Sequence, residues 1–446
     1  MQLSGVEKPR VGVIAPELTP RLQYVLEVLL GQLLAVEWQF CPWANTPPDW
    51  QVAATLVYTP PEQEFPDFAD WMGQTAVQVQ WSGVLQETAT RPLAFADLQG
   101  ADDPQAEAND LVDPLARAFV RLTNYPAWSG QASRDTYNRA NPHDLTWDSY
   151  EWTEGAEVPR IAWELAQQLG LEPPIALPQP PLLTVDLDNP WLIQQKPFWV
   201  QAGGFVKNML KKANVLPVNT YLQVATGKQR DPNQHFFDWL EKIGPEQNVL
   251  LFALPGTKHP LDSRFQPGHR AWEQLLRRLA EQGFALGLHP SYRCVDEPQR
   301  LAQEKDWLEQ VLGRSVNQVR MHYLRLRELD TRRQFLQLGL ANDYTTCWAD
   351  IPGFQYGMDR PFRWFDVEAN TSTDLWLHPT TLMDRTLLSY LKLTPEQGVQ
   401  EWRKWRKISE MQGGQFIPLV HNELWSEAAE WRGWSQLVPE IEALFG

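Results

Sequence analysis

After residue 182, the chain alternates between two kinds of segment that differ in the spacing of their apolar residues. Short runs of apolar and β-branched residues predict buried strands, and segments with apolar residues three and four positions apart predict amphipathic helices. The predicted strands lie at residues 182–186, 249–254, 285–289, 318–323, 339–344, 373–378 and 415–421. The predicted helices lie at residues 203–212, 234–243, 271–282, 298–312, 331–338, 382–391 and 395–412. This alternation predicts a parallel sheet, and the segment is long enough for the sheet to close into a barrel.

The first third of the chain predicts a smaller α/β domain. Its predicted strands lie at residues 10–16, 36–41 and 52–58, and its predicted helices at residues 21–34, 109–122 and 157–169. Residues 127–157 are polar and aromatic, with little periodicity. The proline-rich residues 171–183 cannot continue a helix or lie in a central strand, so they predict a boundary between domains at 1–172 and 182–446.

The composition excludes several classes of function. The 446 residues carry a formal net charge of −16, which argues against a nucleic-acid surface. The three cysteines have neither the spacing of a disulfide framework nor that of a metal knuckle. The N-terminus lacks the apolar core of a signal peptide, and the apolar run at 24–34 is too short for a membrane span, so a cytoplasmic protein is expected. The 22 tryptophans supply flat faces that suit protein cores and sugar rings alike.

Side chains that bind metals gather at the predicted strand ends. Asp186 and Asp188 lie two residues apart, so they share one face of the first strand. Four of the eight histidines lie at later strand ends: His289, His322, His378 and His421. In a parallel barrel these ends meet at one rim, where carboxylates and imidazoles suit a divalent metal such as zinc. Taken alone, the two aspartates are equally compatible with a turn in which they cap backbone amides.

Several short motifs follow one another in the order expected of one family. They are residues 184–188 (TVDLD), 287–292 (GLHPSY), 320–324 (RMHYL), 342–344 (NDY), 353–354 (GF), 360–362 (RPF) and 420–422 (VHN). On these motifs, residues 182–425 resemble the polysaccharide deacetylase (NodB-like) superfamily of carbohydrate esterases. More narrowly, the chain resembles a bacterial subgroup that carries an additional N-terminal domain of unknown function.

This resemblance implies a distorted (β/α)7 barrel and metal-dependent hydrolysis of N- or O-acetyl groups on a poly- or oligosaccharide. It also implies roles for individual residues. Asp186 takes the place of the general base, and Arg320 that of the arginine that orients it. Asp188 and His289 take the places of metal ligands. His421 takes the place of the general acid that protonates the leaving group.

The chain departs from the family pattern at two positions. Leu187 separates the two aspartates, which are adjacent in the family's usual first motif. Arg293 stands where the family has a second histidine, and a guanidinium cannot bind a metal. His322 is the candidate for the missing ligand, because it follows Arg320 by two residues and would share its face of the strand. We therefore expect His322 within bonding or one-water distance of Asp188 and His289.

Other residues and functions remain open from the sequence. Tyr292, Trp348 and Trp425 are candidate platforms for sugar rings, although core packing is the commoner role of such residues. His378 has no counterpart in the family pattern and is expected to be structural. If the metal site is lost, the alternative function is a non-catalytic glycan-binding or assembly protein. A glycosidase that uses Asp186 and Asp188 as acid and base is a further alternative.

Overall fold

The computed structural model describes two compact units of the 446-residue chain. The described residues are 8–43, 52–59, 75–80, 84–85, 113–130, 132–142, 155–172, 178–196, 216–257, 259–262 and 268–445. The smaller unit comprises residues 1–133, 142–177 and 356–374, and the larger unit residues 134–141, 178–355 and 375–446. Each unit therefore includes a short segment from the other predicted domain. The predicted domain limits of 1–172 and 182–446 stay predictions.

The smaller unit contains a four-stranded parallel sheet in the order β2-β1-β3-β4. These strands are β1 (Arg10–Ala15), β2 (Glu37–Pro42), β3 (Ala54–Thr59) and β4 (Thr75–Gln80). β3 is buried along its whole length and β1 along all but its first residue, as expected for inner strands of a parallel sheet. The three strands predicted here are found, and β4 is an additional strand that the sequence pattern did not reveal.

Helices of the smaller unit begin at recognisable capping residues. They are α1 (Pro20–Leu26), the π-helix η1 (Glu27–Leu33), α3 (Pro114–Thr123), α4 (Tyr125–Trp128) and α5 (Glu157–Gln168). Thr19 and Asp113 cap α1 and α3, and a proline follows each cap at the first helical position. The predicted helix at 21–34 is therefore two consecutive segments, α1 and η1.

An aromatic cluster links these helices to β10 (Phe362–Asp366) within the smaller unit. The ring of Phe365 lies 5.0 Å from that of Tyr24 and 5.2 Å from that of Phe119. The Tyr24 hydroxyl donates a hydrogen bond of 2.6 Å to the Arg363 carbonyl. This packing explains why residues 356–374 belong to the smaller unit although they lie far along the chain.

The larger unit is built on parallel strands in the order β9-β8-β7-β6-β5-β13-β12. They are β5 (Leu183–Leu187), β6 (Val249–Ala253), β7 (Ala285–Leu288), β8 (Gln318–Val319), β9 (Asn342–Asp343), β12 (Leu382–Met383) and β13 (Pro418–His421). The end of β11 (Thr371–Leu377), through Trp376 and Leu377, pairs with β9 in this unit, whereas the first residues of β11 belong to the smaller unit. Asp186 of β5 lies opposite His421 of β13 and Phe252 of β6. Among the described residues no ladder joins β11 to β12, so the closed (β/α)7 barrel stays a prediction.

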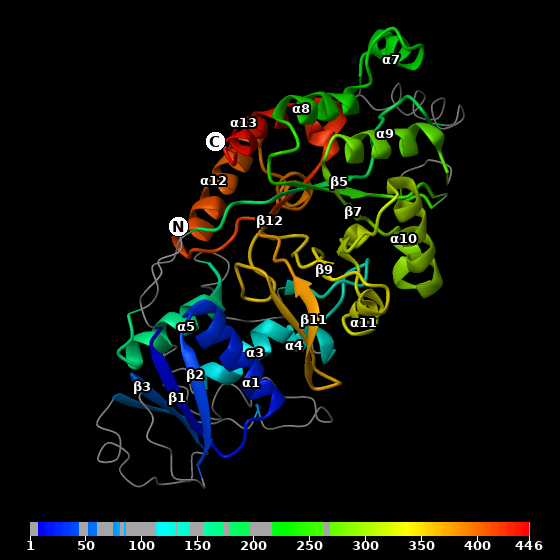
Figure 1. Cartoon of the computed structure of the whole chain (residues 1–446). Coiled ribbons are helices and arrows are strands. Elements are labelled where there is room, and N and C mark those ends of the chain that lie inside the picture. The colour runs from blue at the N-terminus through cyan, green and yellow to red at the C-terminus, as the bar shows by residue number, and fades with distance from the viewer. Residues whose placement is uncertain are drawn as a thin grey trace. The chain divides into compact units, whose positions relative to one another are not determined.

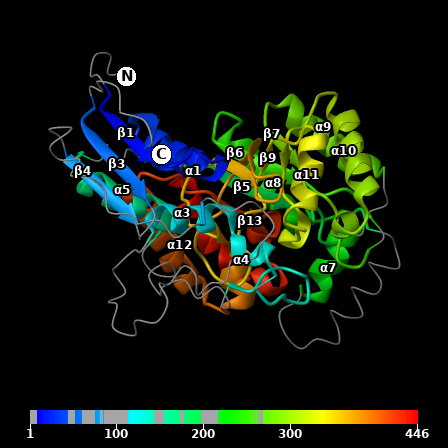
Figure 2. The ribbon, with the colours of Figure 1, turned by 90° about the horizontal axis from the view of Figure 1, so that it is seen from below.

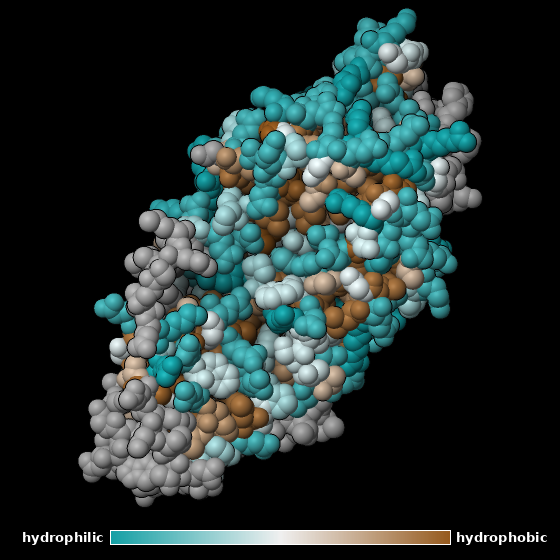
Figure 3. All heavy atoms as spheres, viewed as in Figure 1, coloured by the Kyte–Doolittle hydropathy of each residue, from teal (hydrophilic) through white to brown (hydrophobic). Residues whose placement is uncertain are grey.

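Helices surround these strands in Figures 1 and 2, where α9, α10 and α11 follow one another along one side. The helices are α7 (Val218–Ala225), α8 (His235–Ile243), α9 (Arg270–Glu281), α10 (Pro298–Leu312), α11 (Asp330–Gln337), α12 (Pro395–Met411) and α13 (Val438–Glu442). Shorter turns are η5 (Pro232–Gln234), η6 (Tyr292–Val295), η7 (His322–Leu324), η8 (Thr386–Tyr390), η9 (Asn422–Ser426), η10 (Ala429–Trp431) and η11 (Trp434–Leu437). On the face in Figure 3, hydrophilic residues dominate these helices and hydrophobic residues show in the recesses.

Two predicted elements of this unit are wrong in detail, and a third lies outside the described residues. The predicted helix at 382–391 is instead β12 followed by a single π-helical turn, η8. The predicted strand at 318–323 ends at Val319, and it cannot extend to residue 323 because Tyr323 and Leu324 adopt φ values of 60° and 56°. The predicted helix at 203–212 falls on residues that the structure does not describe. Among the described residues, none of the helices combines the length and apolar composition that a bilayer crossing requires.

Helix α12 shows how closely the outer helices pack against their surroundings. Thr394 and Gln397 form a capping box at its start, and Trp402 and Trp405 are buried along one face. Gly398 lies against the buried Trp434 ring, and a Cβ atom added there would lie 2.7 Å from Trp434 Cζ3. Glycine is therefore required at this helix position by close packing.

The substitution Gly398→Ala is expected to lower the free energy of unfolding by about 1–3 kcal/mol, because the methyl group overpacks the Trp434 contact. Differential scanning calorimetry measures this as a lower melting temperature. Gly31→Ala is the matched control, since nothing lies within 4 Å of the added Cβ atom in that helical turn. The control is expected to be neutral or stabilising. A Gly398→Ala protein that melts at or above the wild-type temperature would contradict the packing argument.

Candidate metal centre

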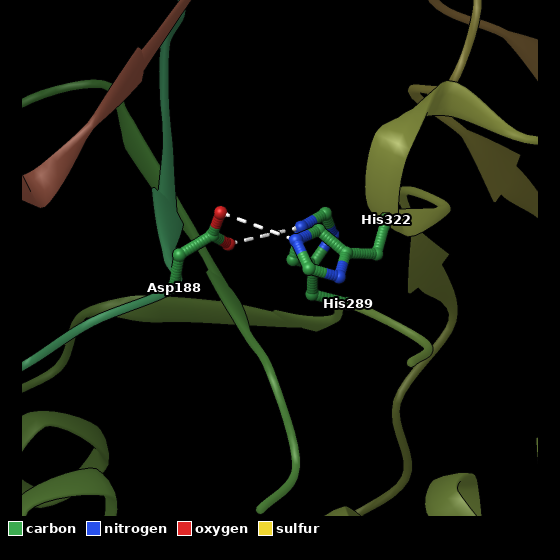
Figure 4. Close-up of side chains that lie close together, drawn as sticks. All are labelled: Asp188, His289 and His322. Atoms are coloured by element: carbon green, nitrogen blue, oxygen red, sulfur yellow. Dashed lines mark hydrogen bonds and ion pairs between the residues drawn. The ribbon is translucent and has the colours of Figure 1, made fainter. Parts of the chain in front are cut away.

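Three side chains from separate segments of the larger unit converge at the carboxyl ends of its strands. Asp188 follows β5, His289 follows β7 and His322 opens the turn after β8. One ligand atom from each residue lies within 4.8 Å of the others. His289 Nε2 is 3.2 Å from Asp188 Oδ1, and His322 Nε2 is 3.3 Å from Asp188 Oδ2. Figure 4 shows both imidazoles facing this carboxylate from the same side.

The orientation of the His289 ring is fixed by a backbone carbonyl. His289 Nδ1 lies 2.6 Å from the Arg320 carbonyl oxygen, which can only accept a hydrogen bond. Nδ1 therefore carries the proton in the neutral ring, and the lone pair of Nε2 points toward the two aspartates. This Nε2 atom is buried and has no hydrogen-bond partner. Such second contacts commonly fix the tautomer of a histidine that binds a metal.

The His322 ring is oriented by a carboxylate. Its Nδ1 lies 2.9 Å from Asp262 Oδ1, and Asp262 in turn accepts hydrogen bonds from the Thr257 hydroxyl and the Tyr292 backbone amide. Burial lowers the pKa of His322, but the Asp188 and Asp262 carboxylates outweigh it and raise this pKa to about 10. Burial likewise opposes ionisation of Asp188, but the His322 imidazole holds the pKa of this carboxyl well below its usual range. Without a metal, a proton on His322 thus balances the charge of Asp188.

The three residues fit a divalent metal ion. Asp188 Oδ1 and His289 Nε2 are buried polar atoms without hydrogen-bond partners, which is costly unless a cation or proton satisfies them. Two imidazole nitrogens and one carboxylate oxygen are a common ligand set of catalytic zinc sites that keep a fourth position open. Arg293 does not belong to this group, because its side chain is 55% exposed and pairs with Glu297. His322 therefore lies where the sequence analysis expected it, near both Asp188 and His289.

Asp186 lies beside this cluster and is held by Arg320. Arg320 Nη1 donates a hydrogen bond of 3.0 Å to Asp186 Oδ1, while Asp186 Oδ2 lies 3.5 Å from His289 Nε2. The guanidinium also donates to Thr184 Oγ1 at 2.7 Å and lies 4.5 Å from the centre of the Phe252 ring. Arg320 is fully buried. It leaves one oxygen of Asp186 directed toward the cluster.

His421 approaches from β13 on the other side of β5. Its Nδ1 lies 2.7 Å from Asp384 Oδ1, and its backbone amide donates to Asp384 Oδ2 at 2.7 Å. Its Nε2 lies 3.7 Å from Asp188 Oδ2. Burial lowers the pKa of His421, but Asp384 and, to a smaller extent, Asp188 and Asp186 raise it to about 9. His421 is therefore a proton carrier next to the cluster.

A cavity of about 530 Å³ opens over these residues within the larger unit. Its lining includes Asp186, Asp188, His322 and His421, together with Glu423 and Arg385. Burial raises the pKa of the Glu423 carboxyl above its usual range, although Arg385 opposes the shift. Three tyrosines contribute aromatic rings to the lining: Tyr137, Tyr323 and Tyr390.

The aromatic residues proposed from the sequence lie elsewhere. Trp348 is buried, and Trp425 is buried against Phe236 and Trp239 at ring distances of 4.9 and 4.7 Å. Tyr292 stacks on His259 with ring centres 4.9 Å apart. None of these three is among the residues that line the cavity. His378 stacks on Tyr344 and bonds to Asn342, and burial with Arg320 lowers its pKa to about 3, as suits a structural histidine.

Several residues of the site carried no signal in the sequence. Asp262 lies in a loop after β6, and Asp384 follows a two-residue strand. Neither residue therefore lies in a segment whose hydrophobic periodicity could have identified it. Tyr137 lies in the segment without periodicity in the first third of the chain. An aspartate that orients a histidine is recognisable only once the two side chains are seen to meet.

Among known proteins, similarity to this chain is found in solved structures. No family model matches the chain, and no curated protein matches it. Among solved structures, the chain is similar to a candidate polysaccharide deacetylase from Mycobacterium smegmatis, at 17% identity and a TM-score of 0.37, over 60% of this chain and 86% of the other. A second candidate polysaccharide deacetylase, from Pseudomonas aeruginosa PAO1, is 11% identical over 59% of this chain and 84% of the other, with a TM-score of 0.37.

A third similar structure is Agd3, described as a novel carbohydrate deacetylase. The two sequences are 9% identical, and the similarity covers 98% of this chain and 84% of the Agd3 chain, with a TM-score of 0.35. All three descriptions name the class that the ordered motifs of the sequence resemble.

The Asp384→Asn substitution is expected to lower the pKa of His421 from about 9 toward 6.5, because it removes the carboxylate that stabilises the imidazolium. Histidine NMR titration of chelator-treated protein measures this change. In the wild type the folded-state pKa is raised, so the stabilisation is complete below about pH 6.5 and is lost as the pH rises through about 9. Asp238→Asn on the exposed face of α8 is the control. An unchanged His421 titration in Asp384→Asn would rule out this carboxylate as the cause.

Proposed function

We propose that the larger unit binds one divalent metal ion through Asp188, His289 and His322 and hydrolyses acetyl groups on a glycan. The observation that carries this proposal is the convergence of three ligand atoms within 4.8 Å, two of which have no hydrogen-bond partner. Zinc is the expected ion, because two imidazoles and one carboxylate suit it. The glycan and its acetyl group follow from the family resemblance of the motifs that supply these residues.

A bound divalent ion would polarise an acyl carbonyl and lower the pKa of a water molecule. Asp188 and His322 line the cavity, where both the carbonyl and the water would approach the ion. The orientation of the His289 and His322 rings is set in advance by the Arg320 carbonyl and the Asp262 carboxylate. Such fixed second contacts typically change metal affinity or activity by about 10- to 100-fold when removed.

Asp186 is placed to accept a proton from the attacking water. Arg320 holds one of its oxygens, and the other lies 3.5 Å from His289 Nε2, beside the expected position of the metal. A carboxylate in this position acts as general base if it reaches the water that loses the proton. Arg320 orients the carboxylate and does not itself line the cavity.

His421 is placed to protonate the leaving amine or alkoxide. Asp384 fixes its ring through Nδ1, which leaves Nε2 directed toward Asp188 and the cavity. A histidine whose pKa is raised retains its proton at neutral pH until the leaving group takes it. Asp186 and His421 are register partners on neighbouring parallel strands, and both line the cavity, so base and acid reach the same space.

The glycosidase alternative is less well supported by these contacts. Glycosidases place a sugar between two carboxylates that are about 5 to 9.5 Å apart. Here His289 Nε2 lies 3.5 Å from Asp186 Oδ2 and 3.2 Å from Asp188 Oδ1, so an imidazole approaches both carboxylates. The space between them suits a cation better than a sugar ring. The non-catalytic glycan-binding alternative is decided by metal analysis.

Metal content tests the ligand set directly. Wild-type protein reconstituted with zinc is expected to hold about one ion per chain, and Asp188→Ala, His289→Ala and His322→Ala to hold less than about 0.1. Inductively coupled plasma mass spectrometry of the desalted protein measures this. Arg293→Gln is the control, since its exposed guanidinium pairs with Glu297 and should leave the metal content unchanged. A wild-type protein that holds no metal after reconstitution would favour the non-catalytic alternative.

Product analysis tests the reaction. Acetate release from acetylated oligosaccharides is expected from the zinc-loaded wild type, without new reducing ends. Asp186→Asn and His421→Ala are each expected to lower kcat by roughly 10²- to 10⁴-fold, because each removes one proton transfer. Both variants should retain the metal, which separates proton transfer from ligand loss. Reducing ends without acetate would overturn the esterase proposal in favour of a glycosidase.

A further inference from the structure

A short hairpin from the first third of the chain belongs to the larger unit and lines its cavity. Residues 134–141 are part of that unit, and Arg134 and Ala140 pair as an isolated antiparallel bridge. The Asp135 carboxylate closes the turn by accepting hydrogen bonds of 2.9 Å from the backbone amides of Tyr137 and Arg139. The hairpin is therefore a defined structure that can hold side chains in fixed positions.

Arg139 fastens this hairpin to the rest of the unit. Its Nη1 donates to the Tyr323 carbonyl at 3.3 Å, and its Nη2 donates to the Tyr390 hydroxyl at 3.0 Å. Its Nε donates to Asp135 Oδ2 at 2.7 Å. From the other side, Arg325 Nε donates to the Tyr137 carbonyl at 3.1 Å. All three nitrogens of the Arg139 guanidinium thus make contacts within the unit, so this side chain holds its neighbours in position.

The tyrosines around Arg139 form a continuous series that begins at the metal cluster. The Tyr323 ring lies 4.7 Å from that of His322, and the Tyr137 ring lies 4.8 Å from that of Tyr323. The Arg139 guanidinium lies 4.9 Å from the Tyr137 ring and 5.8 Å from the Tyr390 ring. All three tyrosines line the cavity, and Tyr390 remains 40% exposed.

Tyr292 supports this series from behind. Its ring packs edge-on against Tyr323 at 5.4 Å and Tyr137 at 6.5 Å, and it is not among the cavity-lining residues. The Arg325 guanidinium covers its ring at 4.0 Å. The half-buried rings of Tyr137 and Tyr323 therefore rest on a fixed layer, which reduces the conformational entropy that they lose when a ligand binds.

We propose that Tyr137, Tyr323 and Tyr390, positioned by Arg139, bind the sugar rings next to the acetylated sugar of an oligosaccharide. This inference rests on the proposed function. A pyranose ring has an apolar face of C–H groups and a polar edge of hydroxyls, which matches a tyrosine ring with its hydroxyl. Because the tyrosines extend away from the metal cluster, they reach sugars beyond the one that is deacetylated. An oligosaccharide would make these contacts, and an acetylated monosaccharide would lack most of them.

The test measures how affinity depends on the length of the oligosaccharide. Isothermal titration calorimetry of zinc-loaded protein uses two probe series of one to five sugars, N-acetylated chitooligosaccharides and O-acetylated xylooligosaccharides. Wild-type protein is expected to bind one series more tightly with each added sugar. Tyr137→Ala is expected to weaken binding of the tetrasaccharide roughly 3- to 10-fold, with a smaller effect on the monosaccharide. In assays of acetate release, Tyr137→Ala is expected to raise KM more than it lowers kcat.

Conservative variants distinguish ring stacking from a general structural effect. Tyr137→Phe keeps the ring, so its affinity is expected to rise with oligosaccharide length as in the wild type. If Tyr137→Phe weakens tetrasaccharide binding as much as Tyr137→Ala does, the stacking role is wrong. Arg139→Lys loses the forked contacts to Tyr323 and Tyr390 and is expected to weaken tetrasaccharide binding without changing metal content. The inference is also wrong if neither wild-type series binds more tightly with length. Metal content and acetate release from the monosaccharides then decide the proposed function independently.

Discussion

The buried ion pair between the Arg320 guanidinium and the Asp186 carboxylate is the interaction on which the site depends. The guanidinium is fully buried, and a charge in such a position is stable only if its hydrogen bonds and its counter-charge are satisfied. Asp186 supplies the counter-charge, and Thr184 and the Tyr344 carbonyl accept further hydrogen bonds. The carbonyl of the same residue fixes the tautomer of His289. One residue thus orients both the proposed base and a proposed metal ligand, so the two cannot move independently.

The charges around this arginine explain why a cation suits the centre of the site. Asp186, Asp188, Asp262 and Asp384 all approach imidazoles, and the pKa values of His322 and His421 rise to about 10 and about 9. Protons on these rings offset the carboxylates when no metal is present. A divalent ion would compete with the proton of His322, because both need the same Nε2 lone pair. The electrostatics that raise these pKa values are therefore those that favour a metal ion.

The walls of the cavity come from parts of the chain that are remote in sequence. Residues 134–141 belong to the larger unit, whereas residues 356–374 belong to the smaller one. Arg139 and Arg325 make reciprocal hydrogen bonds to backbone carbonyls, which hold the hairpin at the cavity. A domain boundary drawn at the proline-rich residues 171–183 alone separates Tyr137 from the site that it lines.

The sequence by itself determined the alternating strands and helices of the larger unit, and it located Asp186, Asp188, His289 and His421 at strand ends. These features follow from local periodicity and from motif order, which need no knowledge of distant contacts. The sequence also selected His322, but for the wrong reason. A strand through residue 323 would have directed Tyr323 into the helical layer, whereas the positive φ values of Tyr323 and Leu324 turn it toward the cavity.

Only the tertiary structure decided the partners of these residues: Asp262 for His322, Asp384 for His421, and the hairpin of Arg139 for the aromatic wall. Each partner lies far along the chain from the residue that it orients, in a loop or next to a very short strand. Such segments have no hydrophobic periodicity from which the direction of a side chain could be predicted. Orientation of a side chain by a distant carboxylate depends on which loops meet in space. That meeting is fixed by the packing of the whole sheet and its helices, and no local pattern in the sequence encodes it.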